Sequence, residues 1–374
     1  MSIDIAIIEK HEELKRRLAA GEYKTLVDIF LEWFDRAIRK ITRQPKPLPI
    51  WLVTVNLCVL VFMIGYVSIY VTGDFLAFPD PVAAFGLFGT LLVSILSGVL
   101  AIVSAVAINL YINRIFVLWR DKVLESIESV ESLDEIEDWL EKTCNKRAHF
   151  WMTIIGALLG SLYLITIVSR LAGGFVGYGT TFTFIILSMF SSAFLYLFVM
   201  IGLLASGLRR YHLKLFAADP SSSELVSRLS NELSFIIYFV AIYAAILTLV
   251  NALSRGFIPL FGFFLVLFLW LPIIAMFVLN QTSLASIIRR SKWKTLNEIQ
   301  VKVEKLQAVE NFEDKETMEA INRLMDYHDR VKATRDSALD FRTYLGFFNS
   351  LLLPLLAFIL GNLDLVLKLF GIRP

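Results

Sequence analysis

The residues best placed to do chemistry inside a membrane lie in the last apolar segment, 344–369. They recur every three or four positions, so a helix would carry them on one face. This stripe consists of Asn349, Leu353, Leu356, Leu360 and Asp364. An amide, a run of leucines and a carboxylate in that order suit a cation pore with a hydrophobic leucine gate, once several copies surround an axis. Pro354 removes a backbone donor and predicts a kink in the same helix.

An ordinary packed helix explains the same stripe, with Asn349 as an interhelical hydrogen-bonding group and Asp364 at the membrane interface. Neutral polar residues also occur in the other apolar segments, where we interpret them as hydrogen-bonding groups between helices. They are Asn56, Asn109, Asn251, Asn280 and Gln281. Ionisable residues are nearly absent from those segments, which argues against proton-coupled transport.

The sequence contains no pattern typical of an enzyme or a metal site. The histidines are scattered, and none pairs with a carboxylate at the four-residue spacing of a zinc site on one helix. They are His11, His149, His212 and His328. The sequence has no Gly-rich phosphate loop after a strand and no nucleophile elbow. We therefore expect no catalysis, no metal and no cofactor.

A short glycine-containing stretch, 176–179, reads Val-Gly-Tyr-Gly and matches the core of the potassium-channel selectivity filter. Such a filter follows a pore helix of about a dozen residues. Only residues 172–175 separate this stretch from the preceding apolar segment. We interpret it as a hairpin turn.

Composition places the chain in a membrane. Of its 374 residues, 57% are hydrophobic and 19% charged, 30 are Phe, and the mean hydropathy is +0.66, so a water-soluble surface could not cover the apolar content. The net charge of +2 gives no reason to expect a nucleic-acid partner. Cys58 and Cys144 fall in different environments, which argues against a disulfide. The fold class we predict is an all-α, polytopic membrane helical bundle with a lipid bilayer as its main partner.

Seven apolar segments meet the length of about 20 residues that a helix needs to cross a bilayer. They are 50–71, 83–113, 150–171, 181–207, 233–254, 257–288 and 344–369. The first six form three hairpins with short turns on one side and long polar segments on the other. Those polar segments hold 32 of the 36 Lys and Arg residues, which predicts a cytoplasmic N-terminus, a C-terminus outside and a multi-pass protein of the cell membrane.

This topology divides the chain into four parts. They are a cytoplasmic amphipathic arm (1–48), a six-span domain (49–292) that includes a cytoplasmic helix (116–148), a cytoplasmic helical anchor (293–342) and the seventh span (343–374). Apolar residues at helical spacing predict one helix over 121–143, and further helices over 293–309 and 317–338 on either side of a turn at 311–314. These helices can pack on each other or on another subunit.

The topology and the start of the last segment resemble the seven-transmembrane ion channels typified by insect odorant and gustatory receptors. The signature of that family, Thr-Tyr followed by five hydrophobic residues and Gln-Phe, has a partial counterpart from Thr343-Tyr344 to Asn349. Here the gap is four residues, Asn replaces Gln, and Ser350 replaces the Phe. The resemblance implies a homotetramer, a pore lined by the seventh span, an anchor of cytoplasmic helices and a pocket for a small-molecule ligand.

The sequence supports three hypotheses for function. The first is an oligomeric cation channel, opened by a ligand or another stimulus. The second is a uniporter-type carrier of a neutral solute, and the third is a non-conducting membrane receptor or scaffold that acts through its cytoplasmic helices.

Overall fold

The computed structural model describes residues 2–72, 83–163, 178–253, 259–309 and 315–337. This part of the chain is helical, and its only β pairing is an isolated bridge between Ile127 and Leu213. The all-α class is therefore confirmed for the described residues. The seventh span, with Thr343, Tyr344, Asn349, Leu353, Pro354, Leu356, Leu360 and Asp364, lies outside them.

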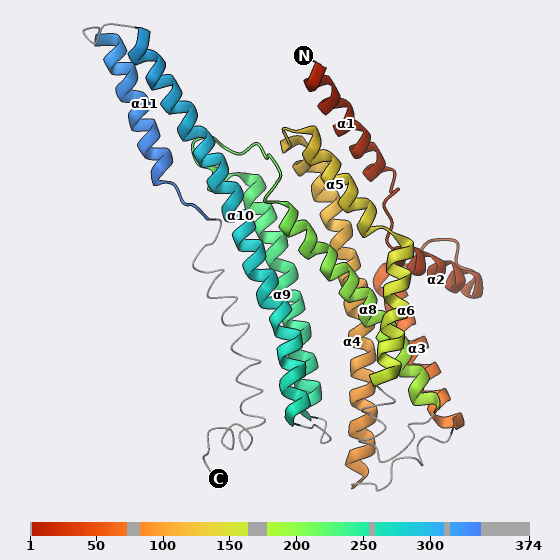
Figure 1. Ribbon diagram of the computed structural model, residues 1–374. Helices are drawn as coiled ribbons and strands as arrows, with labels where there is room; N and C mark the ends of the chain where they lie inside the picture. The colour runs from red at the N-terminus through yellow and green to blue at the C-terminus, as the bar shows by residue number, and fades with distance from the viewer. Residues whose placement is uncertain (1, 73–82, 164–177, 254–258, 310–314, 338–374) are drawn as a thin grey trace, which may run out of the picture.

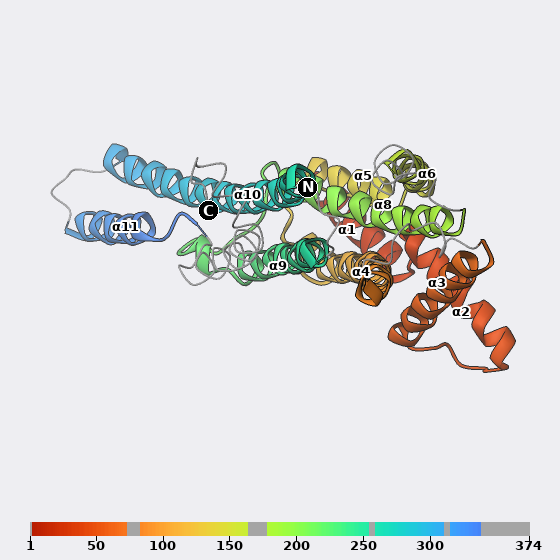
Figure 2. The same ribbon diagram turned by 90° about the horizontal axis from the view of Figure 1, so that it is seen from below.

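Six long helices run alongside one another (Figure 1), and Figure 2 shows the same helices from below, where the longest of them lies lengthwise across the view. They are α3 (Ile50–Thr72), α4 (Ala83–Leu118), α6 (Lys146–Tyr163), α8 (Tyr178–Gly207), α9 (Glu224–Leu253) and α10 (Pro259–Val309). Of the described residues, four stretches in α4, α8, α9 and α10 are long and apolar enough to cross a membrane. The protein is an integral membrane protein. Tyr178 and Gly179 begin α8, so the second half of the filter-like stretch is helical; Val176 and Gly177 lie outside the described residues.

Charged residues of α4, α6, α9 and α10 gather at one end of the bundle, the upper end in Figure 1, whereas α3 and α8 contain none. In α4 the first is Arg114, in α6 the last is Arg147, in α9 the last is Glu232 and in α10 the first is Arg289. Because neighbouring helices run in opposite directions, the start of one helix lies beside the end of the next. The four residues therefore lie at similar heights along the bundle. We call this the polar end of the bundle.

At the polar end, α10 continues without a break past its first charged residues to Val309, a helix of 51 residues. The boundary expected between residues 292 and 293 therefore falls inside one helix. α11 (Lys315–Ala333) packs back along the last turns of α10, around Ile299, Val303 and Ile321, which is one of the two arrangements left open by the sequence. α11 ends at Ala333 rather than 338, and the turn expected at 311–314 lies outside the described residues.

The single helix expected over 121–143 is wrong. α4 passes into a π-helical turn (Trp119–Val123) and a 3-10 turn (Leu124–Ser126), and the chain is then extended at Ile127. Two hydrogen bonds to the 211–214 segment compete with the helix: Glu128 N donates to His212 O at 3.0 Å, and Lys214 N donates to Ser126 O at 2.6 Å. α5 (Val130–Thr143) begins afresh after Ser129, whose hydroxyl accepts from Ser132 N and caps the helix.

α5 buries its apolar stripe inside its own chain, with α8 and α1 as its main neighbours, rather than leaving it for another subunit. Leu133, Ile136 and Leu140 are fully buried, and the indole of Trp139 donates to Met200 O at 2.8 Å. Trp139 also meets Trp119, which in turn packs edge-on against Tyr211. Together, the hydrogen bond and the two aromatic contacts join α5, α8, the π-helical turn and the segment at Tyr211 into one core at the polar end.

The N-terminal arm forms two helices of different direction. α1 (Ser2–Ala19) runs alongside α5 at the polar end, whereas α2 (Leu26–Thr42) lies across the direction of α4 and α8 (Figure 1). α1 is attached by ion pairs: Lys10 meets Asp134 at 2.9 Å and also Glu137, which pairs with Arg17. The two carboxylates raise the pKa of Lys10 above its usual range.

Candidate functional site

A lysine of α10 ties the end of α11 to the bundle. Lys292 lies one turn beyond Arg289, and its side chain is only 8% exposed. Its Nζ donates to Thr334 O at 2.7 Å and meets Asp336 Oδ1 at 2.8 Å. The Lys292 ammonium lowers the pKa of the Asp336 carboxyl, with Arg289 adding a smaller effect. We call Lys292, Thr334 and Asp336 the latch.

The latch lies directly before the last apolar segment in the chain. Asp336 is separated by only seven residues from position 344, where that segment begins. Lys292 itself stands just beyond the end of the apolar part of α10. The latch therefore brings the chain back to the polar boundary of the bundle immediately before the segment.

A set of polar contacts fixes α10 at the same level. Arg209, beyond the end of α8, donates to Ser283 Oγ at 3.2 Å and to Thr282 Oγ1 at 2.6 Å. Arg290 donates to Arg210 O at 3.3 Å. These contacts come from the segment after α8 and the latch from the end of α11, so two separate parts of the chain hold α10 near the end of its apolar part.

A cavity of about 280 Å³ lies beside these contacts, between α10 and the 211–217 segment. Lys294 reaches over it to Glu128, with 3.0 Å between Nζ and Oε2. His212, Lys214 and Glu298 also line it. The cavity carries both signs of charge, and its Lys294–Glu128 pair is already formed, so it does not select one class of ligand.

Deeper in the bundle, buried polar groups connect α4, α9 and α10. Asn280 is buried and donates to Leu233 O at 3.3 Å, which confirms its predicted role between helices. Tyr111 donates to Glu232 O, and Arg114 pairs with the Glu232 carboxylate at 2.7 Å. These contacts hold α9 between α4 and α10.

The other predicted hydrogen-bonding groups differ. Asn56 donates to Leu52 O at 2.7 Å, which lies in the same helix. This hydrogen bond is not the contact between helices that was predicted for Asn56. Asn109 joins α4 to α2 rather than to another long helix, because Thr25 and Asp28 reach it from the N-terminal arm. Gln281 is buried. The side chain of Asn251 and all of Asn349 lie outside the described residues.

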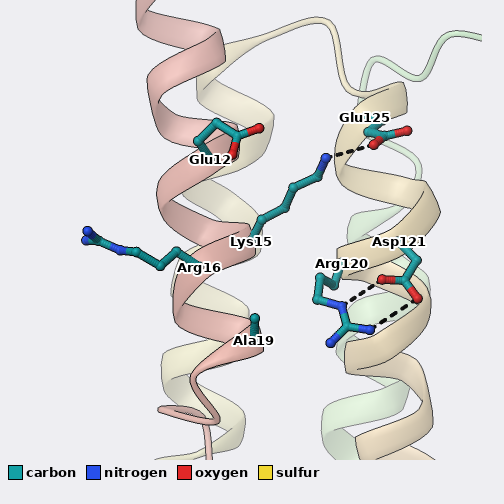
Figure 3. A pocket seen from close by; sticks show the side chains of 7 residues that line it. All are labelled: Glu12, Lys15, Arg16, Ala19, Arg120, Asp121 and Glu125. Atoms are coloured by element: carbon teal, nitrogen blue, oxygen red, sulfur yellow. Dashed lines mark hydrogen bonds and ion pairs between the residues drawn. The ribbon is translucent and has the colours of Figure 1, made fainter.

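An open groove separates α1 from the end of α4 (Figure 3). Lys15 crosses it to Glu125 at 2.7 Å, and Arg120 pairs with Asp121 at 2.6 Å, while Arg16 points away. These pairs lower the pKa values of both carboxyls. The groove is a charged attachment surface for α1, and two of its acids, Asp121 and Glu125, are already engaged by cations.

No histidine joins a metal-binding cluster in the described part of the chain, where no group of three or more His, Cys, Asp and Glu side chains comes together. In the described residues, Cys58 and Cys144 are free thiols and form no disulfide. Burial raises the pKa of Cys144 to about 12.

Sequence reasoning missed the latch. Lys292 is one of twelve basic residues in 289–343, and its partner Asp336 is 44 positions away, so no local pattern marks the pair. Comparisons with protein-family models, curated proteins and solved structures gave no match to this chain.

Proposed function

We propose that this protein is an oligomeric, cation-permeable channel whose pore is lined by the last apolar segment. Leu353, Leu356 and Leu360 would form its hydrophobic gate, with Asn349 at the inner end and Asp364 at the outer end. Residues 293–342 would anchor the subunits in the cytoplasm.

The latch is the observation that carries this proposal. It returns the chain to the polar end of the bundle just before an apolar segment of 26 residues. As a helix that segment would extend about 39 Å, more than the apolar thickness of a bilayer. This favours a seventh crossing from this side, with the C-terminus on the opposite side.

The distribution of charge supports the orientation. The polar end of the bundle carries the Lys- and Arg-rich segments, and such segments remain in the cytoplasm. We therefore assign α1, α5 and α11 to the cytoplasm and propose that the protein resides in the cell membrane.

Several copies are required because each chain supplies one pore-lining helix. A single helix cannot enclose a water-filled path, whereas a ring of them can. We propose a homotetramer, opened by a small-molecule ligand or by another stimulus that acts on the membrane part.

The test is current recorded from the purified protein in planar bilayers, over a range of voltages and membrane tensions. We expect a cation current, an increased open probability in Leu356→Asn because a polar side chain wets the gate, and reduced cation selectivity in Asp364→Lys. Two variants serve as controls: Leu158→Asn changes an exposed leucine of α6, and Asp326→Lys changes an exposed carboxylate of α11.

The proposal fails if neither wild type nor Leu356→Asn conducts under any of these conditions. It also fails if the controls alter the current as much as the pore variants do. A monomeric state in lipid nanodiscs would exclude an axial pore independently of any current.

A non-conducting receptor or scaffold is the second candidate, favoured by the surface of the α10–α11 hairpin. Trp293, Val301, Met318 and Met325 are exposed on it although they are apolar. This function would be supported if the intact protein does not conduct and captures a cytosolic partner stoichiometrically. Capture should be lost in Trp293→Ala and retained in Leu158→Asn.

A further inference from the structure

α2 is held firmly across the bundle by one part of its surface. Val27, Leu31 and Phe34 are buried against the long helices. Its N-terminus carries a capping box, in which Thr25 Oγ1 accepts from Asp28 N and the Asp28 carboxylate accepts from Thr25 N. α2 therefore has a fixed orientation relative to the bundle.

Two more contacts fix the position of α2 along the length of the bundle. Asp28 Oδ1 accepts from Asn109 Nδ2 at 2.6 Å and from Asn113 Nδ2 at 2.9 Å, just before the first charge of α4 at Arg114. α2 thus lies at the boundary between the apolar and polar parts of the bundle.

The apolar surface of α2 extends well beyond its buried part. At about 100° per residue, its apolar side chains cover roughly 200° of the helix, more than three times the roughly 60° spanned by the buried Val27, Leu31 and Phe34. In the uncovered part, Trp33 is 58% exposed and Ile41 is 82% exposed. Arg36 and Lys40 are exposed beside Trp33.

The cations near this surface outnumber the acids that remain available. Glu32 pairs with Lys24, and Asp35 pairs with Arg39 at 2.9 Å while also accepting from Leu48 N. Beyond these pairs, the exposed cations are Arg36, Lys40, Arg43 and Lys46. The uncovered surface of α2 is therefore apolar with a positive border.

The next helix in the chain shows what this surface meets. α3 starts at Ile50 and exposes Trp51, Val55 and Val59, which face hydrocarbon in an integral membrane protein. α2 precedes it by only seven residues and lies across its direction. An amphipathic helix at this depth and direction lies in the plane of the membrane interface.

We propose that α2 is an in-plane interfacial helix that binds anionic lipid headgroups, with Trp33 and Ile41 inserted among acyl chains and Arg36, Lys40, Arg43 and Lys46 on the phosphates. Long basic side chains keep their charges at the headgroups while their stems cover apolar surface. Headgroup charge attracts such cations, whereas zwitterionic lipid does not. The proposal does not depend on ion conduction.

The experiment uses the intact protein in phosphatidylcholine nanodiscs that contain a minor fraction of brominated lipid, which quenches nearby tryptophans. The chain has seven tryptophans, so the contribution of Trp33 is the difference between wild type and Trp33→Phe. We expect brominated phosphatidylglycerol to quench Trp33 more than the same fraction of brominated phosphatidylcholine. This preference should fall about fivefold for each cation removed in Arg36→Gln and Lys40→Gln, the fold-change that about 1 kcal/mol per charge represents.

The matched control is Lys302→Gln with Lys305→Gln, two lysines near the far end of α10 that should leave the preference unchanged. The proposal would be overturned if neither brominated lipid quenched Trp33. Quenching of Trp33 by aqueous acrylamide would then indicate that this face of α2 is exposed to solvent. Protection of Trp33 from acrylamide would indicate that a second copy or another protein covers it. Equal quenching by the two lipids would overturn the assignment to anionic headgroups.

Discussion

Replacing Lys292 with methionine should release residues 334–337 from α10 while preserving most of the packing of the side chain. A hydrogen bond from a charged donor, such as the 2.7 Å contact with Thr334 O, contributes about 1.5–3 kcal/mol. Asp336 is 56% exposed, so the ion pair adds only about 0–1 kcal/mol. The free energy of opening this segment should fall by about 2 kcal/mol, which raises its open population about 30-fold.

Hydrogen exchange of the Thr334 amide measures this population, because that amide donates to Val331 O at 3.1 Å in the closed state. Lys294→Met is the matched control: Lys294 lies on the same helix and pairs with Glu128, but its side chain is 63% exposed. We expect exchange at 334–337 to accelerate about 30-fold in Lys292→Met and to remain unchanged in Lys294→Met. Unchanged exchange in Lys292→Met, or an equal acceleration in both variants, would refute the latch.

Acid should weaken the latch without opening it, since the hydrogen bond to Thr334 O remains. Because the pKa of Asp336 is lowered in the folded protein, the contribution of its ion pair is complete above the ordinary carboxyl value and is lost as pH falls through the folded pKa. Protection factors at 334–337 should stay constant from pH 7 to about 5 and decline below about 4, whereas Asp336→Asn should abolish this decline; a decline in that variant would contradict the assignment. Gly156→Ala should separate α6 from α8, since a Cβ there would lie 2.4 Å from Ser192 Cβ, and should lower stability by about 1–3 kcal/mol. Ser192→Gly should restore the thermal stability of that variant in detergent, and failure of this rescue would contradict the packing.

The described parts of the first six apolar segments are helices as predicted, because length and composition decide the structure of such segments in a membrane. Helix ends were less predictable. α9 begins at Glu224 rather than 233, and α10 continues through Arg289 and Arg290, because charges end an apolar segment without ending a helix. Periodicity also continued across Ile127, where hydrogen bonds to residues 212–214 interrupt the helix.

The sequence did contain a local signal for α2. Thr25 followed three residues later by Asp28 is a capping pattern, and the segment after it is amphipathic. The depth of α2 was not predictable, because it depends on Asn109 and Asn113, more than 80 positions away. For the same reason, Asn109 was assigned to contacts between spans although its partners lie in the N-terminal arm.

The internal proline of α10, Pro272, lies on the membrane side of the latch. Pro272 interrupts the backbone hydrogen bonding of the helix, and it precedes Lys292 by 20 residues, or about 30 Å. Between them, Asn280 ties α10 to α9, and Arg209 ties its Thr282–Ser283 turn to the end of α8. These ties hold α10 to its neighbours between Pro272 and the latch, and Lys292 joins α10 to residues 334–336. In the proposed channel, the start of the last apolar segment would follow α10 rather than move independently of it.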